Sequence, residues 1–175
     1  MAQIIYKTGF EGQNRIECTE GIEINLFNGQ KALICPKYAR KELLEGEALD
    51  QWGAPEETEI EALMLENSYY KTYQLFALVS PAAMWVSQFF SDKHNTLFTL
   101  PSLLAAMEIH RQQKDIDLLA ETIGGADLLR DFSSSIWSCS RFNEYQAWAV
   151  NDRFGYVSYY RTFNPYLAIP VILYR

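Results

Sequence analysis

The sequence predicts an α+β fold, with a terminal antiparallel sheet packed by helices and preceded by a β-rich N-terminal extension. Three observations indicate this order. Apolar-rich runs flank an Asn28-Gly29 pair, apolar residues recur at helical spacing between Ser80 and Gly125, and the period changes to two from Ile136. The 175 residues are 49% hydrophobic, which suffices for a buried core.

A β-hairpin is expected near the N-terminus. The stretch "IEINLFNGQKALIC" (22–35) holds two apolar-rich runs, and Asn28-Gly29 between them suits a type I′ turn, which needs a positive φ at both central residues. Pro36 ends the second run. The acidic, weakly periodic stretch from Tyr38 to Asn67 predicts a surface loop or short helices inserted into this part. We therefore expect residues 1–75 to form an N-terminal β-rich part and 76–175 to form the core.

Three segments have the spacing of helices. Ser80 and Pro81 supply an N-cap and a proline at the first helical position, so "AAMWVSQFF" is predicted to form about three turns. A second helix is expected to open at Pro101, and a third to end at Gly124-Gly125. The apolar side chains that these helices are expected to bury are Ala82, Trp85, Phe89, Leu103, Leu104, Met107, Ile116, Leu119 and Ile123.

The C-terminal segment predicts four short strands: "IWSCS", "AWAVND", "YVSYYRT" and "AIPVILYR". Sequential strands of this length pair antiparallel. We expect residues 147–152 and 156–162 to pair through a turn at Arg153-Phe154-Gly155. Alternation places Trp148 and Val150 on the core side, with Ala147 and Ala149 on the other.

Charge and hydropathy exclude several classes of partner. The net charge of −7 argues against binding nucleic acid and against an anionic membrane surface. No apolar run reaches the roughly 18 residues of a membrane-spanning helix, so membrane insertion is not expected. The opening "MAQIIYKTGF" lacks the basic start and apolar centre of a signal peptide.

The sequence carries no recognisable catalytic or metal-binding motif. His94 and His110 are its only histidines, and Cys18, Cys35 and Cys139 lack metal-ligand spacing. We therefore expect no catalytic residues, no cofactor and no bound metal. The carboxylates between Glu42 and Glu66 are expected to form a solvated acidic face, although the pattern also allows a weak cation site.

The stretch from Trp137 to Tyr166 is rich in Tyr, Phe, Trp, Asn, Ser and Arg. Its aromatic residues could be core, but several lie outside any strand period, and of the adjacent Tyr159 and Tyr160 one should point outward. Exposed Tyr combined with Asn, Ser and Arg is typical of binding surfaces. We expect one continuous exposed surface to be formed by Arg141, Phe142, Asn143, Tyr145, Arg153, Tyr156, Tyr159, Arg161, Asn164 and Tyr166.

Two long stretches resemble the C-type-lectin-fold domains of bacteria and phages, and the resemblance covers about residues 76–175. One is "VSPAAMWVSQFFSDKHNTLFTLPSLLAAMEIHRQQKDIDLLAETIGG", whose order of helices is similar to that of the family. The other, "IWSCSRFNEYQAWAVNDRFGYVSYYRTFNPYLAIPVILY", is similar to its C-terminal strands. The family includes the C-terminal domains of collagen-like adhesins and variable proteins diversified by retroelements.

The resemblance implies a twisted antiparallel sheet with flanking helices, whose C-terminal strands and loops display the ligand-binding residues. "SRFNEYQ" and "YYRTFNPY" look like the display loops, and Trp137, Trp148 and Val150 look like the scaffold beneath them. The chain departs from the family at "FTLPS", where "W-x-LPT" is usual, and at Ile169, where the family has arginine. Of the calcium-dependent lectins' motifs only Val150-Asn151-Asp152 is present, so calcium-dependent sugar binding is not expected.

Three functional hypotheses follow. The first is a non-enzymatic ligand-binding domain, displayed on a phage particle or a bacterial surface, whose ligand is an unknown protein or glycan. The second is a metal-dependent enzyme that uses the acidic segment Glu42–Glu66. The third is a structural module whose aromatic segment is buried in the interface of a homo-oligomer.

Overall fold

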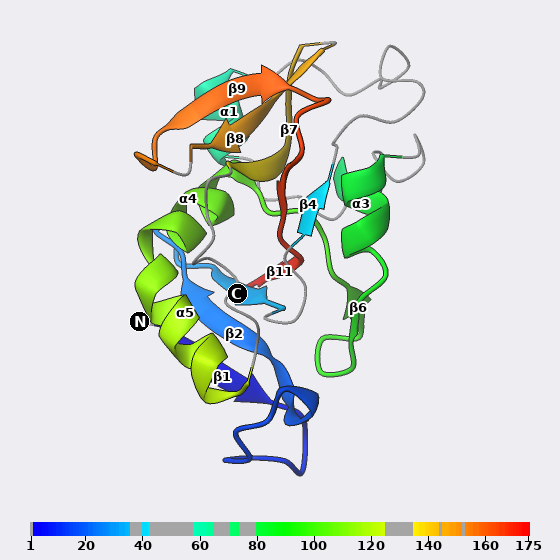
Figure 1. Cartoon of the computed structure of the whole chain (residues 1–175), viewed down its shortest axis with the longest axis vertical. Coiled ribbons are helices and arrows are strands. Elements are labelled where there is room, and N and C mark those ends of the chain that lie inside the picture. The colour runs from blue at the N-terminus through cyan, green and yellow to red at the C-terminus, as the bar shows by residue number, and fades with distance from the viewer. Residues whose placement is uncertain are drawn as a thin grey trace.

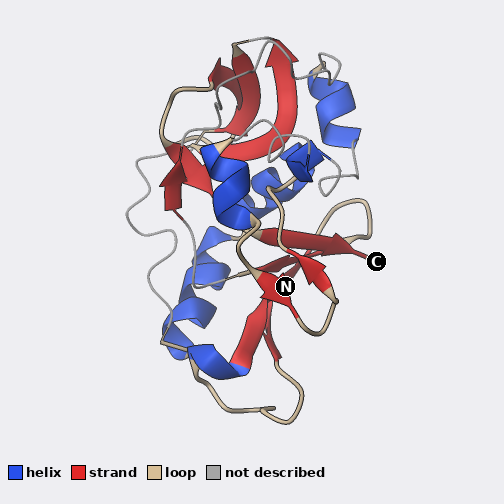
Figure 2. Cartoon of the chain, turned by 90° about the vertical axis from the view of Figure 1, so that its right-hand side faces the viewer, coloured by secondary structure: helices blue, strands red, loops and turns tan. Residues whose placement is uncertain are grey.

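The computed structural model describes residues 2–35, 40–42, 58–64, 71–73, 80–124, 135–143, 145–151 and 153–175. It is a mixed α+β structure, as the sequence predicts. Two sheets occupy different parts of the molecule, with helices beside and between them (Figure 1, Figure 2). The described helices are α1 (Glu59–Met64), α3 (Pro81–Val86), α4 (Leu103–Arg111) and α5 (Gln113–Thr122), with a short 3-10 helix at Ile16–Cys18.

The first sheet joins the two ends of the chain. It has the order β1 (Gln3–Tyr6), β2 (Thr19–Asn25), β3 (Lys31–Ile34) and β11 (Val171–Tyr174), with every neighbouring pair antiparallel. The sequence placed β11 in the terminal sheet, and that expectation is wrong. The chain leaves strand geometry at Ile169-Pro170, and the Pro170 carbonyl accepts a hydrogen bond from the Cys35 amide (3.0 Å). The last strand, β11, therefore pairs with β3 in the first sheet.

The expected hairpin forms, but its turn differs from the predicted type I′. Gly29 has a φ of 80°, whereas Asn28 is not in the positive-φ region. The Leu26 amide donates to the Gln30 carbonyl (2.9 Å), and the Asn28 Oδ1 accepts from the Gln30 amide (3.1 Å). A three-residue loop with one left-handed residue therefore closes the hairpin, and its asparagine side chain supports the turn from outside.

The second sheet carries the aromatic segment. Its order is β4 (Arg40–Glu42), β10 (Tyr166–Ala168), β7 (Ile136–Asn143), β8 (Gln146–Val150) and β9 (Val157–Arg161). The predicted pair is confirmed: β8 and β9 are antiparallel, with Trp148 opposite Tyr159. β10 runs parallel to β7, where Leu167 pairs with Ile136, so the sheet is not antiparallel throughout.

Capping residues set the helix boundaries. The Ser80 hydroxyl accepts from the Ala83 amide (3.4 Å) and starts α3, which ends after six residues instead of the expected three turns. Ser87 and Gln88 form a turn, and Phe90, the last residue of the predicted helix, begins a small hairpin of β5 (Phe90–Ser91) with β6 (Thr96–Leu97). Ser102 caps α4 in the same way, one residue after Pro101. Gly124 has a φ of 71° just past α5, as a helix stop requires.

Strand β8 is buried on both faces. Trp148 and Val150 belong to the main core, which lies among the two sheets and helices α1, α4 and α5. Ala147 and Ala149 face a second core that holds Trp137 and residues of α3. The predicted burial of Trp148 and Val150 is confirmed, and the small side chains on the other face allow a second layer to pack closely.

One buried carboxylate joins all four strands of the first sheet. Glu23 on β2 accepts hydrogen bonds from Gln3 Nε2 on β1 (2.6 Å), Lys31 Nζ on β3 (3.0 Å) and the Tyr174 hydroxyl on β11. Burial by itself raises the pKa of Glu23. The hydrogen bonds from Tyr174, Lys31 and Gln3, with the charge of Lys31, outweigh burial and lower the pKa below its usual value of 4.5.

Replacing Trp148 with alanine should destabilise the fold by roughly 3–5 kcal/mol, because it empties a large volume in the main core. Chemical denaturation of Trp148→Ala beside the unsubstituted chain measures the difference. Tyr159→Ala is the control on the neighbouring strand, and since Tyr159 is 44% exposed its cost should be much smaller. Equal losses from the two substitutions would contradict the described packing.

The hydrogen bonds of Glu23 should make the free energy of unfolding depend on pH. Because its pKa is lowered in the folded state, the carboxylate contributes stability above pH 4.5 that is lost as pH falls through the folded value. Urea unfolding between pH 7 and pH 2 should show a shallower loss for Glu23→Gln than for the unsubstituted chain. Parallel curves would show that Glu23 does not couple protonation to folding.

Candidate functional site

The ten residues predicted to bind a ligand lie on or beside strands β7 to β9, and none of them is fully buried. Five are half-buried: Arg141, Phe142, Asn143, Asn164 and Tyr166. The other five are exposed: Tyr145, Arg153, Tyr156, Tyr159 and Arg161.

An aromatic row crosses three strands on one face of the sheet. Phe142 from β7 stacks on Tyr159 from β9, with ring centroids 3.9 Å apart and planes 4° from parallel. Trp148 from β8 meets both rings edge to face, at 5.2 Å from Phe142 and 5.7 Å from Tyr159. The buried Trp148 therefore orients the two outer rings, and Tyr159 presents its surface to solvent.

Tyr166 lies on the opposite face. Its ring contacts Trp137 and Tyr160, at centroid distances of 4.8 Å and 5.1 Å. Tyr160 points to this side because adjacent strand residues alternate. The predicted single surface is therefore wrong in its extent, since Tyr166 lies on the face of the sheet opposite to Phe142 and Tyr159.

Two asparagines shape the turns at the ends of β8. Asn143 Oδ1 accepts from the Tyr145 amide (2.9 Å), and its amide group donates to Gln146 Oε1 (2.7 Å). At the other end Asn151 Oδ1 accepts from the amides of Arg153 (3.0 Å) and Phe154 (3.1 Å). Asn143 was predicted to bind a ligand, and the structure gives its polar atoms partners within the turn.

The β8–β9 turn displays a second aromatic pair. The rings of Phe154 and Tyr156 stack with centroids 5.9 Å apart, and the Arg153 guanidinium lies 5.3 Å from the Phe154 ring centroid. Gly155 between them has a φ of 69°, and a Cβ at that position would lie 2.6 Å from His110 Nδ1. The tip of the turn therefore lies directly against the end of α4.

A cavity of about 330 Å³ lies at the opposite end of the β8–β9 pair. Its lining residues are Tyr145, Gln146, Arg161, Thr162 and Phe163. The Arg161 guanidinium lies 5.6 Å from the Phe163 ring centroid, and both side chains are exposed. An aromatic wall beside a guanidinium suits a ligand that presents a carboxylate, or hydroxyl groups on a flat apolar face.

Sequence reasoning missed Phe154 and Phe163, which are 66% and 53% exposed. Phe154 was expected only as part of a turn, and Phe163 only as part of the display loop "YYRTFNPY". The available signal was an arginine close by, Arg153 beside Phe154 and Arg161 two residues before Phe163. Arginine next to phenylalanine in a turn provides exposed aromatic area and a guanidinium together.

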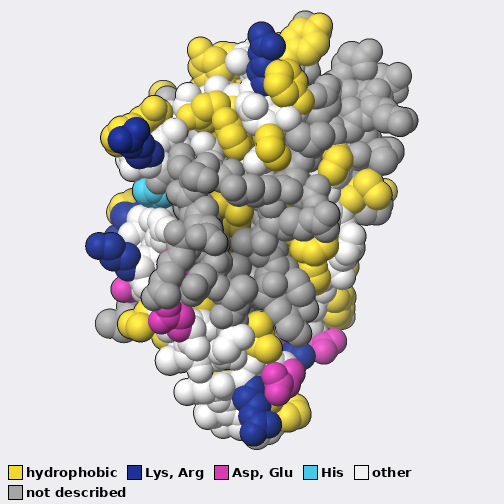
Figure 3. Space-filling model, viewed as in Figure 1, with side chains coloured by type: hydrophobic (Ala, Val, Ile, Leu, Met, Phe, Trp, Pro, Cys, Tyr) yellow, Lys and Arg dark blue, Asp and Glu magenta, His cyan; other side chains and the backbone are white. Residues whose placement is uncertain are grey.

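Charge is unevenly distributed over the molecule. The sequence from residue 135 to 175 has four arginines and two carboxylates, whereas the whole chain has 15 basic and 22 acidic residues. Figure 3 shows hydrophobic and basic side chains together in the upper part, where β7 to β9 lie, and the visible acidic side chains in the lower half. Arg175 follows β11 in the first sheet, so three of these arginines, Arg141, Arg153 and Arg161, and both carboxylates belong to the aromatic end, which is less acidic than the chain as a whole.

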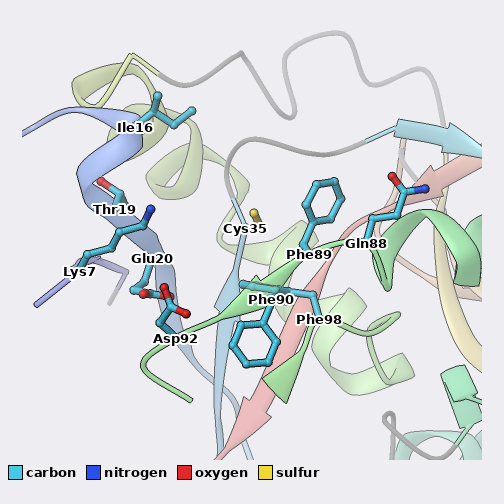
Figure 4. A pocket seen from close by; sticks show the side chains of 10 residues that line it. All are labelled: Lys7, Ile16, Thr19, Glu20, Cys35, Gln88, Phe89, Phe90, Asp92 and Phe98. Carbon is cyan, nitrogen blue, oxygen red and sulfur yellow. The ribbon is translucent and has the colours of Figure 1, made fainter. Parts of the chain in front are cut away.

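A smaller cavity of about 200 Å³ lies between the start of β2 and the β5–β6 hairpin. Figure 4 shows Lys7, Glu20 and Asp92 on one side of it and Phe89 and Phe98 on the other. The carboxylate of Glu20 accepts a hydrogen bond from the buried Ser91 hydroxyl (2.8 Å), which attaches the hairpin to β2. Its charges are of both signs, so the cavity offers no strong preference for an anion or a cation.

In the described part of the chain, the side chains that could serve as nucleophiles or metal ligands lie apart from one another. All three cysteines are buried, and burial raises the pKa of the Cys139 thiol to about 11, opposed by the nearby charge of Lys71. Within the described ranges no cluster of three or more His, Cys, Asp or Glu side chains is placed to hold a metal ion. Most of the acidic segment Glu42–Glu66 lies outside the described residues.

The described helices were also compared with the requirements of a membrane span. None of them combines the length and the apolar character needed to cross a bilayer.

Comparison of the chain with protein-family models, with curated proteins and with solved structures gives no match.

Gly155→Ala should be more destabilising than Gly124→Ala. Both positions have a left-handed φ, which costs a residue with a Cβ about 1–2 kcal/mol. Only Gly155 adds a clash, with His110, since nothing lies within 4 Å of a Cβ at Gly124. Thermal unfolding of the two variants, and of Gly155→Ala combined with His110→Ala, measures this. The double variant should recover the extra loss, and strictly additive effects would show that the turn does not contact α4.

Proposed function

We propose that this chain is a non-enzymatic ligand-binding domain of C-type-lectin fold, displayed by a phage or a bacterial surface protein. Its ligand would be a protein or a glycan. The single observation that carries the proposal is the exposed aromatic and arginine surface of β7 to β9, held in place by the buried Trp148.

The arrangement of this surface favours binding over a purely structural role. Large rings with few rotatable bonds lose little conformational entropy on binding, and arginine offers forked donors beside them. Such residues dominate binding energies at interfaces. Here Tyr145, Tyr156, Phe154 and Phe163 are each more than half exposed, so their apolar area is available to a ligand.

The order of elements supports the proposed fold. Helices α3, α4 and α5 precede the strands β7, β8 and β9, which is the order that the resemblance implies. Trp137, Trp148 and Val150, which the resemblance assigns to the scaffold, are 0%, 5% and 0% exposed. A history of diversification by a retroelement is part of the same proposal, and a reverse transcriptase with a near-identical repeat beside the gene would support it.

Phe163→Ala should weaken ligand binding at least about tenfold, as expected for an exposed aromatic at the centre of a contact. The probes are a glycan array and a displayed library of random peptides, each applied to the whole chain. Ligands selected on the unsubstituted chain are then titrated against the variant by calorimetry.

Phe27→Ala is the matched control for Phe163→Ala. Phe27 is 76% exposed and also lies beneath an arginine, with Arg111 at 5.4 Å from its ring centroid. Affinity should stay unchanged in this variant, and both variants should keep their stability to within about 0.5 kcal/mol. Equal loss of affinity in the two variants, or no selected ligand from either probe, would contradict the proposal.

A further inference from the structure

Strand β9 forms an edge of the second sheet, since it pairs only with β8 in the described part of the chain. We propose that this edge binds an extended, acidic segment of a partner protein as an additional strand. The inference rests on the proposed function and deepens it, because it assigns the ligand to one class and gives its mode of recognition.

The hydrogen bonds of the β8–β9 pair define which backbone groups point outward. The Asn151 amide donates to the Tyr156 carbonyl, and the Thr162 amide donates to the Tyr145 carbonyl, at 2.9 Å and 3.1 Å. Hydrogen-bonded pairs alternate in antiparallel strands, so Ser158 and Tyr160 also direct their backbone groups toward β8.

The residues between them therefore direct their amides away from β8. These are Val157, Tyr159 and Arg161, spaced by two as an added strand requires. The Arg161 carbonyl accepts from the Asn164 amide (3.1 Å), which leaves five outward groups along β9: both groups of Val157 and Tyr159, and the Arg161 amide.

Exposed edge strands usually carry features that prevent pairing with other chains, such as charges, prolines, bulges or short length. The other edge of the same sheet, β4, is only three residues long. Edge strand β1 has a register shift between Ile5 and Tyr6. β9 has five residues in unbroken register, without proline, so these protections are absent except for the charge of Arg161.

Side chains around the edge favour an acidic partner strand with apolar residues. Tyr159 and Arg161 lie two residues apart on β9, so they project to the same face and would flank side chains of the incoming strand. Arg161 also lines the cavity with Phe163 at the end of the strand. Exposed arginines stand near both ends of β9, Arg153 in the turn before it and Arg161 at its last residue, so carboxylates of the segment would gain opposite charges.

Peptides enriched from a random 12-residue display library on the whole chain provide the probe. We expect them to carry acidic residues and to bind through their backbone. N-methylation of every second residue, in the register that pairs with β9, should weaken binding at least tenfold, and N-methylation in the other register should have little effect.

The chain itself offers a matched pair of variants. Val157→Pro removes an outward amide and keeps every β8–β9 hydrogen bond, since proline is tolerated where its nitrogen faces solvent. Val157→Ala also removes the valine side chain beyond Cβ, but it keeps the backbone amide. The proline variant should lose at least tenfold in affinity for the selected peptide relative to the alanine variant, while circular dichroism shows both folded.

The outcomes separate this inference from the proposed function. Peptides that bind equally well after either pattern of N-methylation, or enrichment of no peptide, would overturn strand addition. If the glycan array alone yields a ligand that Phe163→Ala weakens, the proposed function stands and strand addition fails. If the chain forms a dimer in solution and Val157→Pro dissociates it, the occupant of the β9 edge is a second copy of the chain and the proposed partner segment is wrong.

Discussion

Burial of β8 on both faces is the constraint on which the aromatic end of the molecule depends. Trp148 and Val150 are buried in the main core, and Ala147 and Ala149 in the second core. β8 pairs with β7 on one side and with β9 on the other, so its packing also holds these two strands in place. Phe142 and Tyr159 are thereby brought together across it, and β9 becomes the outermost strand.

The remainder of the fold supports this end by joining distant parts of the chain. The crossing at Ile169-Pro170 takes the C-terminus out of the aromatic sheet and pairs β11 with β3. Glu23 then connects the four strands of the first sheet through three hydrogen bonds. The proposed binding surface is thus formed by residues close in sequence, while its support includes both ends of the chain.

Local sequence signals were sufficient to predict many of the helix ends and the β8–β9 pair. Ser80 and Gly124 mark helix ends through a cap and a left-handed stop, and Pro101 stands just before a helix start. The β8–β9 pair follows from two alternating runs around a short turn. The sheet that each strand joins, and the order of strands in that sheet, could not be predicted. Nothing near Val171 indicates which sheet it joins, because its apolar neighbours suit either one. The division of Tyr159 and Tyr166 between two faces also depends on strand order, which periodicity does not contain.

Amide hydrogen exchange on β9 tests the central claim most directly. In the chain alone, the amides of Ser158 and Tyr160 should exchange slowly, and those of Val157, Tyr159 and Arg161 should exchange rapidly, because only the first two point toward β8. Addition of a selected peptide should slow the other three. Slow exchange of all five amides before addition, or unchanged rapid exchange in the complex, would contradict the account of β9 as a binding edge.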